Sequence, residues 1–312
     1  MRAWRLTAIG QPLTLTDLPD PVAGPGEVVL RTMAAGLCLT DVSFSRGTLP
    51  GINPPIVLGH EIAGVITQVG PDVHAFAVGD RVAVRTGMDA PGVVSDGGFG
   101  TLVRTPAERL VAVPDSVSFP QAAVATDAGL SAYHALHDKG GLRAGMKVGV
   151  VSIGGLGSFG VQIAAAAGAD VTAVVRKPAL APVARQLGAT TVVRGAAELA
   201  GLDLDLVVDF AGYSETIVGA VDGLRHGGRV VVVGVEEPVA HIPIGLIVGK
   251  NAEIVGSNAG TNDELRRVLA MIGEHTITPL ITTIAFADIP GALDRLALGG
   301  IAGRLAADLT DD

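Results

Sequence analysis

The sequence predicts an α/β protein in which a β-rich region precedes a doubly wound parallel sheet. Up to about residue 120, short β-branched runs such as 28–30 and 62–66 alternate with turns rich in glycine and proline. This pattern is typical of a small barrel or sandwich. From about residue 121, strand-like and helix-like segments alternate, which indicates a parallel sheet covered by helices.

Each element of the second region follows from local residue patterns. Apolar, β-branched runs predict six strands, at 147–151, 170–175, 190–193, 205–210, 228–233 and 252–255. Helical spacing of apolar residues predicts helices at 159–167, 178–187 and 262–274. The tail, 288–309, is predicted to form a helix and then a strand that packs back on the first region.

Composition limits the classes of function. The 312 residues carry a net charge of −9 with scattered basic residues, so nucleic acid is not an expected partner. Mean hydropathy is +0.49, but no apolar run reaches the ~18 residues of a membrane span. The first residues have no apolar signal segment. We therefore expect a cytoplasmic protein that is not membrane-bound.

A glycine-rich turn lies between the first strand and first helix of the second region, at residues 152–160. Glycines there let the backbone approach a pyrophosphate, and the helix N-terminus supplies N–H donors. Two registers of the dinucleotide fingerprint are possible. One uses Gly155, Gly157 and Gly160, and the other places Ser152 at the first position, followed by Gly154 and Gly157. Both include Leu156 in the turn.

The end of the second strand indicates which nicotinamide cofactor is bound. Sites for NAD usually place an acidic residue there to bind the ribose hydroxyls. This chain instead has Arg176 and Lys177, which would pair with a 2′-phosphate. We therefore expect NADP(H) to be favoured over NAD(H). The alternative is a pair of solvated basic residues.

Cys38 and His60 could be metal ligands. Cys38 is the only cysteine, so it cannot form a disulfide within the chain. A catalytic zinc needs three protein ligands and an open fourth position. Asp127, just before the second region, could be the third ligand. From spacing alone, a buried inert cysteine and a structural histidine are the better interpretation.

Several segments together match one family: 36–41, 58–64, 78–82, 97–99, 125–133, 152–160, 208–212 and 227–230. Through them the chain resembles the medium-chain dehydrogenase/reductase superfamily, in its zinc-dependent alcohol dehydrogenase branch, essentially from end to end. The resemblance implies a GroES-like catalytic domain, residues 1–122 and 258–312, and a Rossmann NAD(P)-binding domain, residues 123–257. It also implies an active site between them and a homo-oligomer, a homodimer or a tetramer.

The resemblance further implies roles for individual residues. Cys38, His60 and Asp127 would bind one catalytic Zn²⁺, with Glu61 beside the metal as a transient ligand. Asp41 would orient His60, and Thr40 would hydrogen-bond the substrate oxygen and pass its proton on. Residues implied to contact the cofactor, besides the glycine-rich turn, are Phe210, Ala211, Val233, Gly234 and a pyrophosphate-binding Arg304.

The chain also departs from the family pattern. It lacks the four cysteines of the structural zinc lobe, which would fall near residues 85–100. Leu39 replaces a basic residue that contacts phosphate, and Ser43 replaces a histidine of the proton relay. The expected function is a zinc-dependent alcohol dehydrogenase or carbonyl reductase acting on an alcohol, aldehyde or ketone. The alternatives are a zinc-independent NADPH-dependent enone or quinone reductase on the same scaffold, and a non-enzymatic protein that binds NADP.

Overall fold

The computed structural model describes residues 1–310 and divides into two compact units. Unit 1 comprises Met1–Asp127, Gly260–His275 and Ile281–Asp312, and unit 2 comprises Ala128–Ala259 and Thr276–Leu280. The domain boundaries that the resemblance implies, after residues 122 and 257, remain a prediction. Residues 276–280 belong to unit 2. There the backbone N–H of Thr278 donates to Gln162 Oε1 at 2.8 Å.

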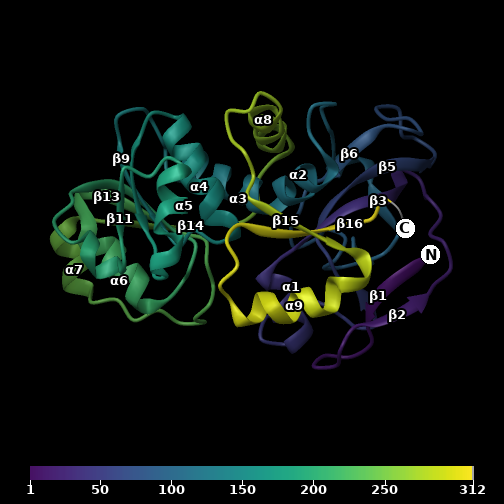
Figure 1. Cartoon of the computed structure of the whole chain (residues 1–312), viewed down its shortest axis with the longest axis horizontal. Coiled ribbons are helices and arrows are strands. Elements are labelled where there is room, and N and C mark those ends of the chain that lie inside the picture. The colour runs from purple at the N-terminus through teal and green to yellow at the C-terminus, as the bar shows by residue number, and fades with distance from the viewer. Residues whose placement is uncertain (311–312) are drawn as a thin grey trace. The chain divides into compact units, whose positions relative to one another are not determined.

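Unit 1 is built on two sheets (Figure 1). Seven strands form the larger sheet, in the order β15-β16-β3-β5-β6-β8, with β7 also paired to β3. Three strands form the smaller one, in the order β2-β1-β4. Their bounds are β1 Arg2–Leu6, β2 Thr14–Asp17, β3 Glu27–Leu37, β4 Ile56–Val57, β5 Glu61–Val69, β6 Arg81–Val84, β7 Leu102–Pro106, β8 Leu110–Ala112, β15 Ile281–Ala285 and β16 Arg304–Asp308.

Strand β3 is the centre of unit 1. It pairs with β5, β7 and β16, and nearly all of its residues are buried. Val28 and Leu30 of β3 pack with Ile62 and Ile66 of β5, all fully buried. Each such side chain contributes about 1.5–3 kcal/mol through removal from water. This packing fixes the ends of β3 and β5, where the candidate site residues lie.

The C-terminal tail packs on the N-terminal strands, as predicted. Helix α9 (Ile289–Leu298) is followed by β16, which runs antiparallel to β3 with Leu305 opposite Leu37. Figure 1 shows this tail in yellow, with α9 beside α1 (Leu39–Arg46), and the two helices are in contact. As a result, the first residue of β16 lies next to the end of β3.

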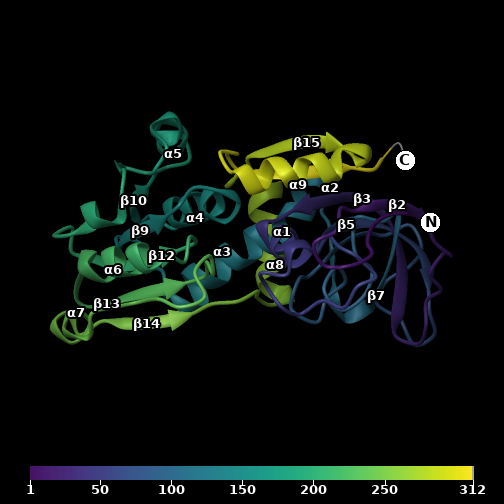
Figure 2. The ribbon, with the colours of Figure 1, turned by 90° about the horizontal axis from the view of Figure 1, so that it is seen from below.

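Unit 2 contains a six-stranded, fully parallel sheet in the order β11-β10-β9-β12-β13-β14. Figure 2 shows β10, β9, β12, β13 and β14 in this order from top to bottom. All six predicted strands are present, so the predicted doubly wound α/β class is confirmed. The bounds are β9 Lys147–Val151, β10 Asp170–Val174, β11 Thr191–Val193, β12 Leu204–Asp209, β13 Leu224–Val232 and β14 Glu253–Gly256.

The start of helix α4 differs from the predicted start. Helix α4 spans Gly155–Ala166 and begins four residues before the predicted start at residue 159, because the glycines of the turn form its first turn. Helices α6 and α7 were not predicted. The remaining bounds are α2 Phe119–Val124, α3 Leu130–His134, α5 Ala181–Gln186, α6 Ser214–Gly223, α7 Ile244–Lys250, α8 Asn262–Gly273, η1 Ala107–Arg109, η2 Ala125–Gly129, η3 Ala135–Lys139, η4 Pro178–Leu180, η5 Ala196–Leu199 and η6 Phe286–Asp288.

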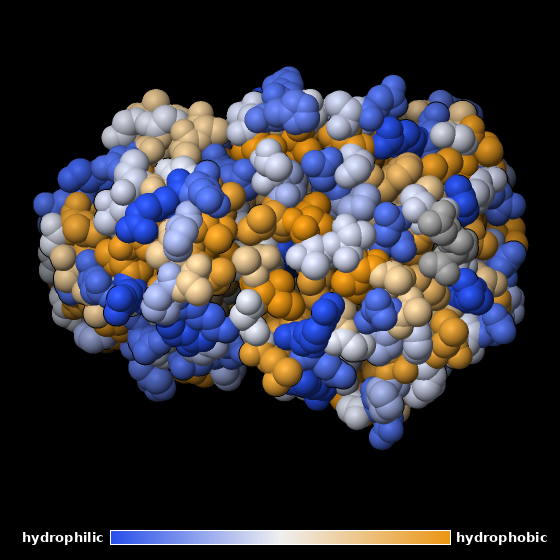
Figure 3. Space-filling model, in the orientation of Figure 1, coloured by the Kyte–Doolittle hydropathy of each residue, from blue (hydrophilic) through white to orange (hydrophobic). Residues whose placement is uncertain are grey.

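The high mean hydropathy of the chain is only partly accounted for by the cores. Figure 3 shows apolar and charged residues interspersed over one face. Helix α7 is apolar in sequence, yet none of its residues is buried. Among the residues that the structure describes, no helix has both the length and the apolar character needed to cross a bilayer.

Candidate metal and cofactor sites

Cys38 lies at the junction between β3 and α1, where it is the N-cap residue of the helix. Its backbone N–H donates to Asp41 Oδ2 at 2.9 Å, which closes a capping box. Capping fixes the start of a helix because it satisfies an N–H group that has no partner within the helix. The Cys38 thiol is therefore held in place by the end of β3 and the start of α1.

His60 immediately precedes β5, and Asp41 orients its ring. Asp41 Oδ1 lies 3.0 Å from His60 Nδ1 and also accepts a hydrogen bond from Gly59 N at 3.2 Å. Gly59 has a φ of +91°, a backbone conformation that favours glycine. With Nδ1 bound to Asp41, Nε2 faces Asp127 Oδ2 at 3.6 Å.

Asp127 lies in the π-helical turn η2, which follows α2. Ser118 and Gln121 form a capping box at the start of α2. The Thr126 hydroxyl is buried and donates to the carbonyl of Ala123 at 2.7 Å. Single π-turns are often found at functional sites, because they change the direction in which side chains point. Here the turn directs Asp127 toward Cys38 and His60.

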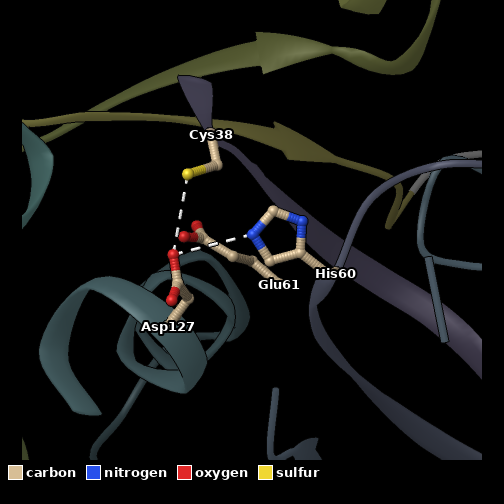
Figure 4. Close-up of side chains that lie close together, drawn as sticks. All are labelled: Cys38, His60, Glu61 and Asp127. Atoms are coloured by element: carbon tan, nitrogen blue, oxygen red, sulfur yellow. Dashed lines mark hydrogen bonds and ion pairs between the residues drawn. The ribbon is translucent and has the colours of Figure 1, made fainter. Parts of the chain in front are cut away.

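Cys38, His60, Glu61 and Asp127 form one cluster (Figure 4). One donor atom of each residue lies within 4.8 Å of the other three, and no second cluster of this kind occurs in residues 1–310. Asp127 Oδ2 lies 3.6 Å from Cys38 Sγ and 3.6 Å from His60 Nε2. Tetrahedral zinc bound to sulfur, nitrogen and oxygen requires donor separations of about 3.3–3.6 Å. The two separations from Asp127 Oδ2 therefore match those of tetrahedral zinc, and sulfur, nitrogen and oxygen are donors that zinc accepts.

Arg304 lies in this cluster, which the sequence did not predict. Its side chain is buried and forms an ion pair with Glu61 through Nη2. Arg304 Nε also donates to Glu61 Oε1 at 3.0 Å and Oε2 at 3.2 Å, and Nη2 donates to Asp127 Oδ2 at 2.9 Å. Its hydrogen-bond partners are thus two carboxylates of the metal cluster. The pyrophosphate contact that the resemblance implies for Arg304 remains a prediction.

The cluster shifts the pKa values of its members. Burial acts to lower the pKa of His60, but the Asp41 and Asp127 carboxylates outweigh it and raise the pKa well above the usual value. Burial acts to raise the pKa of Asp127, and His60 and Arg304 bring it well below its usual range. For Glu61, burial raises the pKa even though Arg304 favours the carboxylate. Strong shifts of this kind are common at functional sites.

Thr40 places a hydroxyl beside Cys38. Its Oγ1 lies 3.4 Å from Cys38 Sγ, and the side chain is half-buried. Leu39, at the position of the missing phosphate contact, is 47% exposed. Ser43 is half-buried.

The backbone of the glycine-rich turn of unit 2 is compatible with the second of the two predicted registers. Ser152 has a φ of +73°, the left-handed conformation expected at the first fingerprint position. Gly154 is the N-cap of α4, and a Cβ there would meet only Ser152 Oγ, at 3.7 Å. A Cβ on Gly157 would lie 1.9 Å from the Ser152 carbonyl oxygen. Space is therefore open beside Gly154, whereas Gly157 permits close packing of the helix start on the turn.

The other predicted cofactor residues lie at the carboxyl ends of neighbouring strands. Arg176 and Lys177 follow β10 and are exposed, and Gly155 and Leu156 lie in the first turn of α4. The remaining four are half-buried and follow β12 or β13: Phe210, Ala211, Val233 and Gly234. In parallel sheets, ligands bind at this edge.

Residues 85–100, where the resemblance places the missing structural zinc lobe, are held by hydrogen bonds and an ion pair. The buried Arg109 forms an ion pair with the exposed Asp89, and Arg109 Nη1 donates to the carbonyl of Arg85. Asp96 Oδ1 accepts a hydrogen bond from Val57 N at 2.8 Å. These contacts anchor the segment to β-structure of unit 1.

Comparisons with known proteins agree with this geometry. Residues 24–115 match the family described as "Alcohol dehydrogenase GroES-like domain", and residues 155–274 match "Zinc-binding dehydrogenase". An alcohol dehydrogenase of Geobacillus stearothermophilus is 32% identical, with 98% of each chain covered. An NADP-dependent alcohol dehydrogenase C 1 of Mycolicibacterium smegmatis is 28% identical, covering 98% of this chain and 97% of that protein.

Solved structures lead to the same family. The acetophenone reductase from Geotrichum candidum in complex with NAD superimposes with a TM-score of 0.92 at 30% identity, covering 100% of this chain and 98% of that one. An NAD-dependent alcohol dehydrogenase gives a TM-score of 0.89 at 27% identity, covering 99% and 100%. The chain therefore belongs to the medium-chain dehydrogenase/reductase superfamily, in its zinc-type alcohol dehydrogenase branch, and is an oxidoreductase of that family.

Proposed function

We propose that this chain is a zinc-dependent alcohol dehydrogenase or carbonyl reductase that transfers hydride between NADP(H) and an alcohol, aldehyde or ketone. The observation that carries the proposal is the convergence of Cys38 Sγ, His60 Nε2 and Asp127 Oδ2, at separations of 3.6 Å from the Asp127 oxygen. In this proposal unit 1 is the catalytic domain and unit 2 is the cofactor-binding domain.

Cys38, His60 and Asp127 would be the three protein ligands. A zinc ion bound there supplies Lewis acidity toward the oxygen of the substrate. Asp41 keeps the proton of neutral His60 on Nδ1, so that the Nε2 lone pair is available to the metal. Burial of Cys38 and His60 keeps bulk water away from these donors.

Thr40 would accept the hydroxyl proton of the substrate and pass a proton on. Its hydroxyl lies 3.4 Å from Cys38 Sγ, and it can both donate and accept a hydrogen bond. In alcohol oxidation it would accept the hydroxyl proton of the substrate while donating its own onward. A nicotinamide cofactor held by unit 2 would supply or accept the hydride, and the protein would contribute alignment and exclusion of water.

The preference for NADP(H) rests on Arg176 and Lys177. Both are exposed, and no acidic residue occupies the end of β10 to repel a 2′-phosphate. Relatives differ in this respect, since the Mycolicibacterium smegmatis protein is named NADP-dependent and the Geotrichum candidum structure contains NAD. The local charge favours the phosphorylated cofactor. A cytoplasmic location and a homodimeric or tetrameric assembly complete the proposal.

The first experiment is the zinc content of the purified, untagged protein by elemental mass spectrometry. We expect about one zinc per chain, which is the number for a catalytic site without a structural one. Cys38→Ser and Asp127→Ala should lose the metal, and a matched Asp96→Ala should retain it. A Cys38→Ser variant with full zinc and full turnover would contradict the proposal.

The second experiment measures turnover with NADP(H) and NAD(H) on a panel of alcohols, aldehydes and ketones. We expect turnover only when zinc is present. Absence of zinc after reconstitution, together with reduction of activated C=C bonds, would instead identify the zinc-independent reductase. Bound zinc and cofactor without turnover of any substrate would favour a non-enzymatic role.

A further inference from the structure

We propose that Gly92 and Gly97 are positioning residues for the metal ligand His60. Because neither has a side chain, the segment that contains them closes directly on the backbone that leads into His60. His60 is a ligand in the zinc site proposed above, on which this inference rests. The segment lies where the resemblance places the missing structural zinc lobe.

Gly59, the residue before His60, is held through both of its backbone polar groups. Its N–H donates to Asp41 Oδ1 at 3.2 Å, and its carbonyl accepts a hydrogen bond from Gly98 N at 2.7 Å. The N–H groups on either side of Gly98 donate to the carbonyls of residues 57–58, at 2.8 and 3.0 Å. Gly59 and Gly98 are buried, so water cannot take the place of these partners. The backbone that leads into His60 is therefore fixed between α1 and the segment around Gly98.

Gly92 lies against the peptide bond between Gly59 and His60. It is buried and has a φ of +86°, a conformation that favours glycine. A Cβ on Gly92 would lie 2.5 Å from the carbonyl oxygen of Gly59 and 2.8 Å from the nitrogen of His60. Non-bonded carbon atoms prefer a separation of about 3.5–4.0 Å, so these contacts would be repulsive. A side chain at Gly92 must therefore displace this peptide bond or the segment itself.

Gly97 contacts the same carbonyl group. A Cβ on Gly97 would collide with the Gly59 oxygen and would lie 2.6 Å from the nitrogen of Gly92. Gly97 is buried, and its φ is not in the left-handed region, so the requirement for glycine there is steric alone. Glycine often marks such a close approach of two backbones. Three glycines from separate parts of the chain thus meet at the start of the ligand residue.

The metal site depends on where this backbone lies. His60 Nε2 faces Asp127 Oδ2 at 3.6 Å (Figure 4). A zinc–nitrogen bond is about 2.0–2.1 Å long and tolerates deviations of about 0.2 Å. Relief of a 2.8 Å contact requires a shift of roughly half an ångström or more. A side chain at Gly92 or Gly97 would therefore move Nε2 out of the range in which it can bind the metal well.

The test uses the full-length protein loaded with Zn²⁺ or Co²⁺. In Gly92→Ala and in Gly97→Ala, the affinity for zinc should fall by about 10–100-fold, as for other residues that orient a ligand. Competition with a chromogenic chelator measures this loss. The absorption spectrum of the cobalt form should shift, because the nitrogen ligand approaches from a changed direction. At saturating zinc, kcat should fall while KM for the cofactor stays unchanged.

Gly79→Ala is the matched control. Gly79 has a φ of +95° and precedes β6, but a Cβ there meets no atom within 4 Å. Alanine at Gly79 therefore brings the same kind of backbone strain as alanine at Gly92, without a contact to the ligand residue. Both variants should unfold at a lower urea concentration than wild type. Only Gly92→Ala should lose zinc affinity and change the cobalt spectrum.

The outcomes distinguish the inference from the proposed function. If the wild-type protein binds no zinc, the proposed function fails and the inference fails with it. If wild type binds zinc, and Gly92→Ala and Gly97→Ala bind it with equal affinity and an unchanged cobalt spectrum, the inference alone is wrong. Equal losses of zinc affinity in Gly79→Ala and Gly92→Ala would also overturn it, because the loss would then follow stability.

Amide hydrogen exchange of the wild-type protein provides the test where the variants do not fold. Zinc binding should slow exchange at Gly98, whose N–H donates to Gly59, more than at Gly79, whose N–H donates to the carbonyl of Ile66. Such a difference means that the metal and this segment stabilise the same backbone. Equal effects of zinc at Gly98 and Gly79 would contradict the inference.

Discussion

Asp41 Oδ1 lies 3.0 Å from His60 Nδ1, and the same carboxylate accepts hydrogen bonds from the backbone N–H groups of Cys38 and Gly59. One fully buried side chain therefore fixes the histidine ring, the start of α1 and the turn before β5. Two of the three proposed zinc ligands depend on it. Asp41 connects the backbone geometry of unit 1 to the metal site.

Replacement of Asp41 by asparagine should weaken zinc binding by about 10–100-fold. The amide cannot hold the Nδ1 proton as strongly as a carboxylate, so His60 no longer presents Nε2 in a single orientation. Competition with a chromogenic chelator measures the affinity. Asp96→Asn is the control, because Asp96 also accepts a backbone N–H within unit 1. Equal zinc affinity in Asp41→Asn and wild type would show that Asp41 only caps the helix.

Ser152→Gly should stabilise the protein. The left-handed conformation of Ser152, at a φ of +73°, costs a residue with a side chain about 1–2 kcal/mol. Part of this gain is offset by the flexibility of glycine in the unfolded chain. The free energy of unfolding in urea should rise by about 0.5–1 kcal/mol.

Gly157→Ala tests the same turn through cofactor affinity. Its Cβ would lie 1.9 Å from the Ser152 carbonyl oxygen, so the turn must move and the affinity for the cofactor should fall. A loss of stability in Ser152→Gly, or unchanged cofactor affinity in Gly157→Ala, would contradict the assigned register.

The sequence predicted elements whose pattern is local. The alternation of strands and helices in unit 2 and the helix and strand of the tail follow from apolar spacing, and the structure contains all of them. The start of α4 was misplaced, because glycine weakens the helical signal although Gly155 and Gly157 lie inside the first turn. The register of this turn depends on a backbone angle at Ser152, which residue identity alone does not determine.

The candidate site was predicted less completely. Cys38, His60 and Asp41 lie within short motifs, but the position of Asp127 depends on a π-turn that no sequence pattern indicated. The Glu61–Arg304 pair joins residues 243 positions apart. Its signals in the sequence were a glycine within an apolar strand, Gly36, and a basic residue at the start of a buried strand. Neither signal identifies its partner without the pairing of β5, β3 and β16.

Asp209 should make stability depend on pH. It is fully buried and accepts hydrogen bonds from Ala211 N, Gly212 N and the Thr216 hydroxyl, at 2.8, 3.1 and 2.6 Å. Burial raises its pKa despite these bonds. The folded state therefore holds the proton more tightly than the unfolded state, whose aspartates titrate near about pH 4. The stability that this protonated group contributes is lost as the pH rises through the folded pKa.

Urea unfolding of wild type and Asp209→Asn, at several values between about pH 4 and pH 7, measures this effect. The amide cannot titrate, so the stability of Asp209→Asn relative to wild type should increase as the pH rises. A difference that stays constant or decreases with pH would mean that the Asp209 carboxylate is not destabilised by burial.

Cofactor preference should depend on Arg176. Its exposed guanidinium follows β10, where a 2′-phosphate would form charge-assisted hydrogen bonds worth about 1.5–3 kcal/mol, or roughly 10–100-fold in affinity. Arg176→Asp should lower kcat/KM for NADP(H) by about that factor, because the new carboxylate repels the phosphate. It should also raise kcat/KM for NAD(H), because an acidic residue there can bind the ribose hydroxyls. Steady-state kinetics with both cofactors measures the ratio, and Arg185→Ala, which removes an exposed arginine from α5, should leave it unchanged. If the ratio of kcat/KM for NADP(H) to that for NAD(H) is the same in Arg176→Asp and wild type, the basic residues after β10 are solvated side chains that do not contact the cofactor.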